Sequence, residues 1–332
     1  MSNDAADLQQ EVARFREDFD KLREQIGRVV VGQRDVVEGM LTGLVAGGHV
    51  LLEGPPGLGK TLLARTLADA LKVQFRRIQF TPDLMPSDVI GTYVVMEAHG
   101  RRNFEFQQGP IFANVVLADQ VNRTTPKTQA ALLEAMQEGG TTVANQTWPL
   151  PEPFFLVATQ NSLEAEGTFP LPEAQLDRFL LGLRVRPPSE DELDEILERT
   201  TEYDEPVVEV VLDGPRILEM TDLARQVPIA PEVRRAAIRL VTATHPESPH
   251  AAAMSKQFLR HGASPRAAQA MVLAAKVRAL VAGRVNVSQD DIWRMAHAAL
   301  RHRLVLNFDG HADNVDVDAI VDDVLKTAGG SL

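Results

Sequence analysis

Eight consecutive residues, Gly54 to Thr61, have the types and spacing that bind a phosphate chain. They read GPPGLGKT, which fits the pattern G-x-x-x-x-G-K-[ST] in full. The glycines let backbone N–H groups close on phosphate oxygens, and the helix that follows adds a favourable dipole. Lys60 reaches the β and γ phosphates of a nucleoside triphosphate, and Thr61 offers its hydroxyl to Mg²⁺. The residues expected to contact the nucleotide here are Gly54, Pro55, Pro56, Gly57, Leu58, Gly59, Lys60, Thr61 and Leu62.

A carboxylate with a candidate metal role ends the apolar run NVVLAD, residues 114–119. If this run is a strand of a parallel sheet, Asp119 lies at the carboxyl edge, where it can hold the water shell of Mg²⁺ opposite Lys60. A strand-terminal aspartate can also simply cap a turn. The predicted metal residues are therefore Thr61 and Asp119, and the second depends on the phosphate loop.

The elements that must position these groups are short apolar runs separated by helical stretches. Such alternation is typical of a parallel sheet covered on both faces, and it predicts an α/β core over residues 28–186. Two pairs of β-like segments interrupt the core and read as inserted hairpins, one over 92–109 turning at His99–Gly100 and one over 139–151 turning near Asn145. The five runs predicted as strands are 49–53, 75–80, 114–119, 154–159 and 179–185.

Helices are predicted on both sides of this core. Residues 1–27 form the first unit, because apolar residues recur at steps of three and four over 4–27 and make one stripe that packs on the body. From 187 to 332 the pattern becomes helical, and four helices open with Ser or Pro at capping or first-turn positions. The stripe of the first helix consists of Leu8, Val12, Phe15, Phe19, Leu22 and Ile26.

Composition excludes several classes of protein. Thirty-four Lys and Arg against 46 Asp and Glu give a net charge of −12, the wrong sign for a surface that tracks phosphate backbones, although a local basic patch stays open. No apolar run approaches the roughly 18 to 20 residues that span a bilayer, and the polar, acidic start favours the cytoplasm. The chain has no cysteine, and its eight histidines show no metal-ligand spacing.

Four stretches together resemble the MoxR type of AAA+ ATPase, and the resemblance runs from Val31 to about residue 305. They are GPPGLGKT, VVLADQVNRTTPKTQAALLEAMQEG, LVATQN and FPLPEAQLDRFLL. The resemblance implies an AAA+ phosphate-loop core with a five-stranded parallel sheet, a C-terminal helical lid, ATP and Mg²⁺ as cofactors, and ring oligomers that are mostly hexamers. It also implies that the two hairpins are the helix-2 insert and the pre-sensor-1 hairpin, which point towards a pore.

The same resemblance assigns roles close to the nucleotide. Val31, Gly32 and Gln33 match the segment that lines the adenine pocket. Asn161, which follows the run FFLVAT, matches the residue called sensor 1, whose amide orients the attacking water. The alternative for Asn161 is a turn residue after a strand.

Two arginines match residues that read the γ-phosphate. Arg178 in LDRF matches the arginine finger that enters the neighbouring subunit's site, and its alternative is an ion pair with Asp177 or Glu173. Arg266 in GASPRA matches sensor 2 at a helix start, where a positive charge is unfavourable to the helix dipole unless an anion binds there. The alternative for Arg266 is a solvated surface arginine.

One position departs from the family pattern. AAA+ proteins carry a glutamate after the strand-terminal aspartate, and this chain has Gln120. A carboxamide can hold a water but cannot accept its proton, so we expect ATP binding to survive and hydrolysis to fall by about 10² to 10⁴. Either the protein is a naturally slow member, or the residue is a deliberate Glu→Gln substitution, which the otherwise complete site with Asn161 and Arg178 favours.

The leading interpretation is an ATP-driven machine that remodels or matures partner complexes. The resemblance implies a client complex, often metal-dependent, and a partner with a von Willebrand factor A domain. A small-molecule kinase or GTPase could use the same loop, but the guanine-reading motif NKxD is absent. A nucleic-acid motor or gene regulator of the same branch is the other alternative, and the aromatic content of 5% with the acidic balance speaks against single-strand stacking.

Overall fold

The computed structural model describes residues 2–98, 101–160, 168–201 and 206–329. Its centre is a five-stranded sheet in the order β10-β1-β9-β6-β3, and every neighbouring pair is parallel. This confirms the predicted α/β core, and all five apolar runs became strands of this one sheet. The strands are β1 (Val50–Glu53), β3 (Phe75–Gln79), β6 (Val115–Asp119), β9 (Phe155–Gln160) and β10 (Leu181–Arg184).

The alternation of side chains along each strand divides the core into two apolar clusters. Val50 and Leu52 of β1 lie in one cluster with the helices before and after that strand, whereas Leu51 lies in the other with α5. Both faces of the sheet are therefore buried, which is why its strands read as continuous apolar runs. The helices and short segments of this part are α2 (Arg34–Val45), α3 (Lys60–Ala70), β2 (Leu71–Lys72), α4 (Pro86–Ile90), η1 (Val121–Arg123), α5 (Pro126–Glu138) and α6 (Glu173–Leu176).

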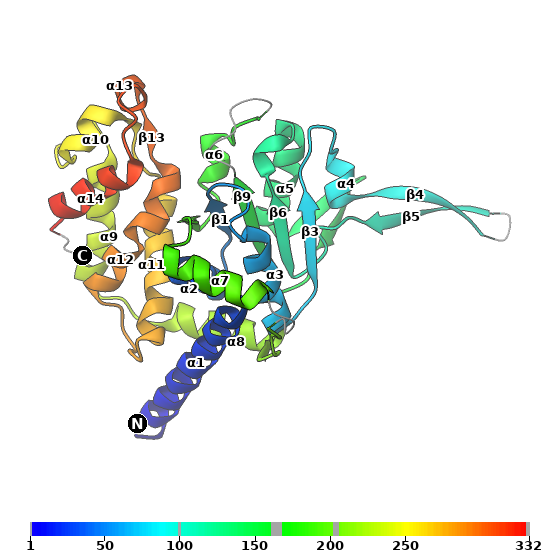
Figure 1. Cartoon of the computed structure of the whole chain (residues 1–332), viewed down its shortest axis with the longest axis horizontal. Coiled ribbons are helices and arrows are strands. Elements are labelled where there is room, and N and C mark those ends of the chain that lie inside the picture. The colour runs from blue at the N-terminus through cyan, green and yellow to red at the C-terminus, as the bar shows by residue number, and fades with distance from the viewer. Residues whose placement is uncertain (1, 99–100, 161–167, 202–205, 330–332) are drawn as a thin grey trace.

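The first helix, α1 (Ser2–Val29), packs on α3 and α11 through the predicted stripe. Five of the six apolar residues are buried, from Val12 to Ile26, but Leu8 is exposed. Figure 1 shows the reason, because the N-terminal part of α1 extends away from the body and has no element to cover it.

Both predicted hairpins are present as antiparallel pairs. The long one, β4 (Gly91–Ala98) with β5 (Arg101–Gln108), projects away from the body on the side opposite the C-terminal helices (Figure 1). Its predicted turn at residues 99–100 lies outside the described residues. The short one is β7 (Gly140–Val143) with β8 (Gln146–Pro149), and its two turn residues, Ala144 and Asn145, both have positive φ, as the tight hairpin turn requires.

The chain after residue 187 is helical, as predicted, with two short strand ladders added. One pairs β12 with β13, and the other pairs β11 with β2 of the core. Among the described residues, no helix is both long and apolar enough to cross a bilayer. The elements are α7 (Glu190–Thr201), β11 (Leu212–Asp213), α8 (Gly214–Gln226), α9 (Pro231–Thr244), α10 (Ala253–Phe258), β12 (Leu259–His261), α11 (Pro265–Val281), α12 (Gln289–Leu300), η2 (Arg301–Arg303), β13 (Val305–Leu306), α13 (Phe308–Ala312) and α14 (Val317–Thr327).

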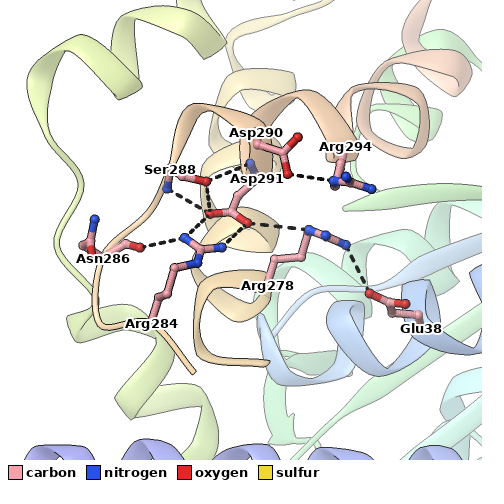
Figure 2. Close-up of polar contacts among 8 residues, drawn as sticks. All are labelled: Glu38, Arg278, Arg284, Asn286, Ser288, Asp290, Asp291 and Arg294. Carbon is pink, nitrogen blue, oxygen red and sulfur yellow. Dashed lines mark hydrogen bonds and ion pairs between the residues drawn. The ribbon is translucent and has the colours of Figure 1, made fainter. Parts of the chain in front are cut away.

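An ionic cluster around the buried Asp291 fixes α11 to α12 and joins both to the core (Figure 2). Asp291 is 1% exposed and accepts two hydrogen bonds from Arg284, at 2.7 and 2.8 Å. Ser288 and Asp291 form the capping box that begins α12. Arg278 lies 3.7 Å from Asp291 and donates to Glu38 of α2 at 3.2 Å, so the cluster connects the lid helices with the α/β core.

Candidate active site

The phosphate loop connects the carboxyl end of β1 to the start of α3, as the sequence predicts. Gly57 and Gly59 have φ of 83° and 74°, a left-handed region that favours glycine. Gly54 is required for a second reason, because a Cβ there would lie 2.5 Å from the carbonyl oxygen of Val185 on the neighbouring strand segment. Pro56, Gly57, Gly59 and Leu62 are exposed, so the loop opens to solvent on one side.

Lys60 bends back over the loop that it follows. Its Nζ donates to the carbonyl oxygens of Gly54 and Pro55, both at 2.7 Å. Burial lowers the pKa of Lys60, and the nearby charge of Asp119 acts in the opposite direction. The amine therefore contacts the loop and also feels the charge of the Asp119 carboxylate. Phosphate oxygens would be stronger acceptors for it than the two carbonyls.

Asp119 ends β6, at the same sheet edge as the loop, and both of its carboxylate oxygens have partners. Arg77 of β3 donates two hydrogen bonds to Oδ2, at 2.6 and 3.1 Å, and Thr159 of β9 donates its hydroxyl to Oδ1 at 2.7 Å. Asp119 is 8% exposed, and residues of the two neighbouring strands hold its carboxylate in place. Carboxylate and hydroxyl oxygens, such as those of Asp119 and Thr61, are the ligands that a hard cation bound to phosphate and water prefers.

Gln120 immediately follows and has a left-handed φ of 59°. Its backbone N–H donates to Thr159 Oγ1 at 2.8 Å, so one threonine orients both Asp119 and the next residue. Its side-chain Oε1 accepts a hydrogen bond from Arg123 at 3.1 Å. The carboxamide has no oxygen that could take a proton from water at neutral pH.

The segment predicted to line the adenine pocket lies against the end of β10 and the start of α7. Gln33 donates to the carbonyl oxygen of Arg186 at 2.6 Å. A Cβ on Gly32 would lie 2.2 Å from the carboxylate of Glu192, and that carboxylate accepts the backbone N–H of Ser189 to begin α7. Val31 directly precedes these two residues and is partly buried. A cleft of about 950 Å³ continues from Gln33 along α2, β10, α12 and α14, and the phosphate loop does not line it.

Arg178, which follows Asp177 in the chain, and Arg266 of the lid have different partners. Arg178 donates to the carbonyl oxygen of Leu133 on α5 at 2.9 Å, whereas Arg266 lies 3.9 Å from Asp177 Oδ2. The alternative ion pairs of Arg178 are not formed, because Asp177 pairs with Arg303 and Arg266, and Glu173 pairs with Arg260. Beside Arg178 is a groove of about 280 Å³ lined by Ala130, Leu133, Glu134, Gln137, Glu138 and Gln175.

The structure thus brings the loop, Lys60, Asp119 and Gln120 together at one sheet edge. Asn161, the residue matching sensor 1, lies outside the described residues. Within the described ranges, neither a hydrogen bond nor an ion pair joins Arg178 or Arg266 to the loop.

Sequence reasoning missed Thr159 and Arg77, which hold Asp119. A signal for Arg77 was present, because the run FRRIQF places two arginines inside a strand where apolar residues dominate. Thr159 is a single polar residue at the end of the buried run FFLVAT, and only the register of β6 against β9 shows that it meets Asp119.

Comparisons with known proteins agree with this geometry. Residues 49–181 match the family described as "ATPase family associated with various cellular activities (AAA)", and residues 251–324 match the AAA lid domain. Chaperone MoxR1 of Mycobacterium tuberculosis is 42% identical, over 91% of this chain and 80% of its own length. The protein YeaC of Bacillus subtilis is 41% identical, over 92% of both chains. A crystal structure from Cytophaga hutchinsonii, described as that of a "putative ATPase", superposes with a TM-score of 0.89 at 37% identity over 98% of both chains.

Proposed function

Since the chain belongs to the MoxR family of AAA+ ATPases, we propose that it is a ring-forming, ATP-driven chaperone that remodels or matures partner complexes, and that with Gln120 it traps ATP. The observation that carries the proposal is the set of groups at one sheet edge: the glycine loop, Lys60 above it, and Asp119 held by Thr159. These are the parts that bind a triphosphate, and Gln120 stands beside them.

The chemistry follows from which groups can bind and which can move a proton. The loop amides and Lys60 would hold the phosphates, and Thr61 and Asp119 would hold Mg²⁺, which would neutralise charge on the phosphate oxygens. Gln120 can position a water by hydrogen bonding, but it leaves the proton on that water. ATP therefore binds and persists, and the protein stays in its ATP-bound form.

A ring explains the place of Arg178. Its guanidinium lies beside an open groove between α5 and α6 and contacts Leu133, with no contact to its own phosphate loop in the described residues. Stabilising a transition-state charge with this arginine requires a neighbouring copy, as in a head-to-tail ring. We propose a hexamer, in keeping with the family, with Arg266 reading the phosphate of its own subunit and Asn161 orienting the water.

The partner surface that we propose is the long hairpin. Phe104 is 75% exposed and lies directly opposite Val95, which is also exposed, so an apolar pair faces solvent on one side of β4 and β5. Arg102 follows towards the tip. We propose that this surface meets a client or a von Willebrand factor A domain protein in the cytoplasm, and that nucleic acid is not the partner.

The decisive experiment compares the chain as given with Gln120→Glu. We expect equal ATP·Mg²⁺ affinity, and turnover higher by about 10² to 10⁴ when the carboxylate is present. Lys60→Ala is the control and should abolish binding in both backgrounds. If Gln120→Glu leaves turnover unchanged while ATP still binds, the assignment of Gln120 is wrong.

A further inference from the structure

The carboxylate of Asp177 joins the α/β core to three residues of the lid. Its Oδ1 accepts hydrogen bonds from Arg303 Nε at 2.9 Å and from Ser264 Oγ at 2.7 Å. Its Oδ2 lies 3.9 Å from Arg266 Nη1. Ser264 is the N-cap of α11, and Arg266 is in its first turn. One side chain of the core therefore contacts the start of the helix that carries the residue proposed to sense the nucleotide.

The lid also holds the backbone of the segment that follows. The guanidinium of Arg303, whose side chain is only 3% exposed, donates to the carbonyl oxygens of Asp177 at 3.1 Å, Phe179 at 2.6 Å and Leu180 at 3.3 Å. His302 donates from Nε2 to the carbonyl oxygen of Phe179 at 3.1 Å. The carboxylate of Asp177 and the carbonyl groups of Asp177, Phe179 and Leu180 thus fix residues 177–180 to η2 of the lid.

Arg178 lies within this segment but faces the opposite way. Its guanidinium donates to Leu133 on α5, beside the open groove. A rigid peptide unit joins residues 177 and 178, so a shift of the Asp177 backbone, which Arg303 holds at its carbonyl oxygen, also moves the backbone of Arg178. A displacement of the lid must therefore either carry Arg178 with it or break a buried ion pair, and breaking such a pair is strongly unfavourable.

We propose that Asp177 is a positioning residue that couples Arg178, the arginine directed at the next subunit, to the lid of its own subunit. The proposal rests on the roles proposed above for Arg178 and Arg266. Through this covalent and ionic path, the nucleotide bound under the lid of one subunit would change the position of Arg178 in the site of the next subunit. Arg303 is the second member of this path, since it contacts both the carboxylate and the carbonyl groups.

The test uses Asp177→Asn, which keeps the shape and the acceptor for Ser264 but removes the negative charge. In the Gln120→Glu background we expect kcat to fall about tenfold, with the KM for ATP and the ring size unchanged, because a small misplacement of a catalytic group costs rate rather than binding. The matched control is Asp291→Asn, which breaks another Asp–Arg pair of the lid (Figure 2), and the hydrogen-bond partners of Asp291 are Arg284 and Ser288 rather than residues 177–180. It should lower the melting temperature without lowering kcat.

A double variant separates a positioning role from an independent one. If Asp177 acts through Arg178, then Asp177→Asn added to Arg178→Ala should cause no further loss of kcat. Losses that multiply, or an Asp177→Asn variant that behaves like Asp291→Asn, would overturn the inference. Should Arg178→Ala alone leave kcat unchanged, the arginine-finger role fails first, and the two failures are distinguished.

Hydrogen exchange gives a second readout that does not need turnover. In the chain as given, ATP·Mg²⁺ should change the exchange rates of the amides in residues 173–182, because the lid moves with the nucleotide. Asp177→Asn should abolish this response, whereas Asp291→Asn should keep it. An unchanged response in Asp177→Asn would refute the coupling even if activity is lost.

Discussion

Asp119 links the proposed metal site to the rest of the sheet. Its ion pair with Arg77 affects how easily its carboxylate can bind a metal ion. Arg77 donates twice to Oδ2, and a bound Mg²⁺ with its water shell would compete for that oxygen. The ion pair is partly exposed, so its strength is within the range of about 0.2 to 1 kcal/mol. We therefore expect Arg77 to raise the Mg²⁺ concentration that the proposed site needs without preventing binding.

Removal of this competition gives a prediction for Arg77→Met. We expect the Mg²⁺ concentration for half-maximal ATP binding to fall by about two- to fivefold. Arg76→Met is the matched control, because adjacent strand residues point to opposite faces and Arg76 makes no contact with Asp119. Titration of Mg²⁺ at fixed ATP measures the effect. A higher Mg²⁺ requirement in Arg77→Met would instead show that Arg77 orients Asp119 for the metal.

A partly buried histidine sets part of the acid sensitivity. His49 accepts the N–H of Leu156 at Nδ1 and donates from Nε2 to Met136, each at 3.1 Å, so the ring is neutral in this geometry. Burial lowers the pKa of His49 from 6.5 to about 4. Below pH 6.5 the unfolded chain binds a proton that the folded chain refuses, so the free energy of unfolding falls until about pH 4.

The expected loss between pH 6.5 and 4 is about 3 kcal/mol, and urea unfolding at several pH values measures it. His49→Gln supplies an amide that does not titrate, so this variant should lose the part of the pH dependence of the unfolding free energy that His49 causes. His302, whose pKa burial also lowers, adds a slope of the same sign that should persist in the variant. An identical pH profile in both proteins would show that His49 is protonated in the folded state.

At the scale of single residues, the sequence predicted the groups with a fixed spacing and missed those that depend on tertiary register. The loop and Asp119 follow from local patterns of strand, glycine and helix. Thr159 and Asp177 act through partners 40 and 126 positions away in the chain. Such pairs arise only when strands and lid have found their places, and a single sequence does not show them.

At the scale of elements, the two hairpins form one unit. Phe106 of the long hairpin stacks on Trp148 of the short one with ring centroids 4.7 Å apart, and Tyr93 donates to Gln146 at 2.9 Å. Alternation of residue types predicted both hairpins, but nothing local shows that they pack on each other. The aromatic contact fixes the base of the long hairpin, so its outer part is presented in a defined direction.

The outer part carries the proposed docking pair, which leads to a prediction at this scale. Val95→Ser with Phe104→Ser should leave ATP binding and ring size unchanged and weaken the capture of partner proteins from a lysate of the source organism. Met96→Ser is the matched control, because Met96 is also exposed but lies on the opposite face of the same hairpin. Equal capture by all three proteins would move the search to Trp148 and the short hairpin.

At the scale of the whole molecule, the parallel sheet and the helical lid follow from the sequence as a class, while the strand order and the small ladders do not. β11 and β13 have two residues each, too few for any periodicity to appear. The helix α14 was not predicted, although Val317, Ile320, Val321 and Val324 are spaced for one buried face. The described chain ends in a lid whose cluster at Asp291 contacts α2, so lid and core share one packed body.

A ring of such bodies predicts that sites are completed by neighbours, and mixing of variants tests this. In the Gln120→Glu background, Arg178→Ala subunits lack a finger and Lys60→Ala subunits lack a working loop, so each should be inactive alone. In an equal mixture that exchanges subunits, about one interface in four pairs an intact loop with an intact finger, because a head-to-tail ring uses two different faces of each copy. Averaged over all interfaces, the ATPase activity of the mixture should therefore recover to about a quarter of that of the parent protein.

The control mixes the Arg178→Ala variant with a variant that carries both Arg178→Ala and Lys60→Ala. This mixture contains no intact finger and should recover no activity. If the first mixture also stays inactive although exchange is demonstrated, Arg178 does not act between subunits, and its contact with Leu133 is its whole role.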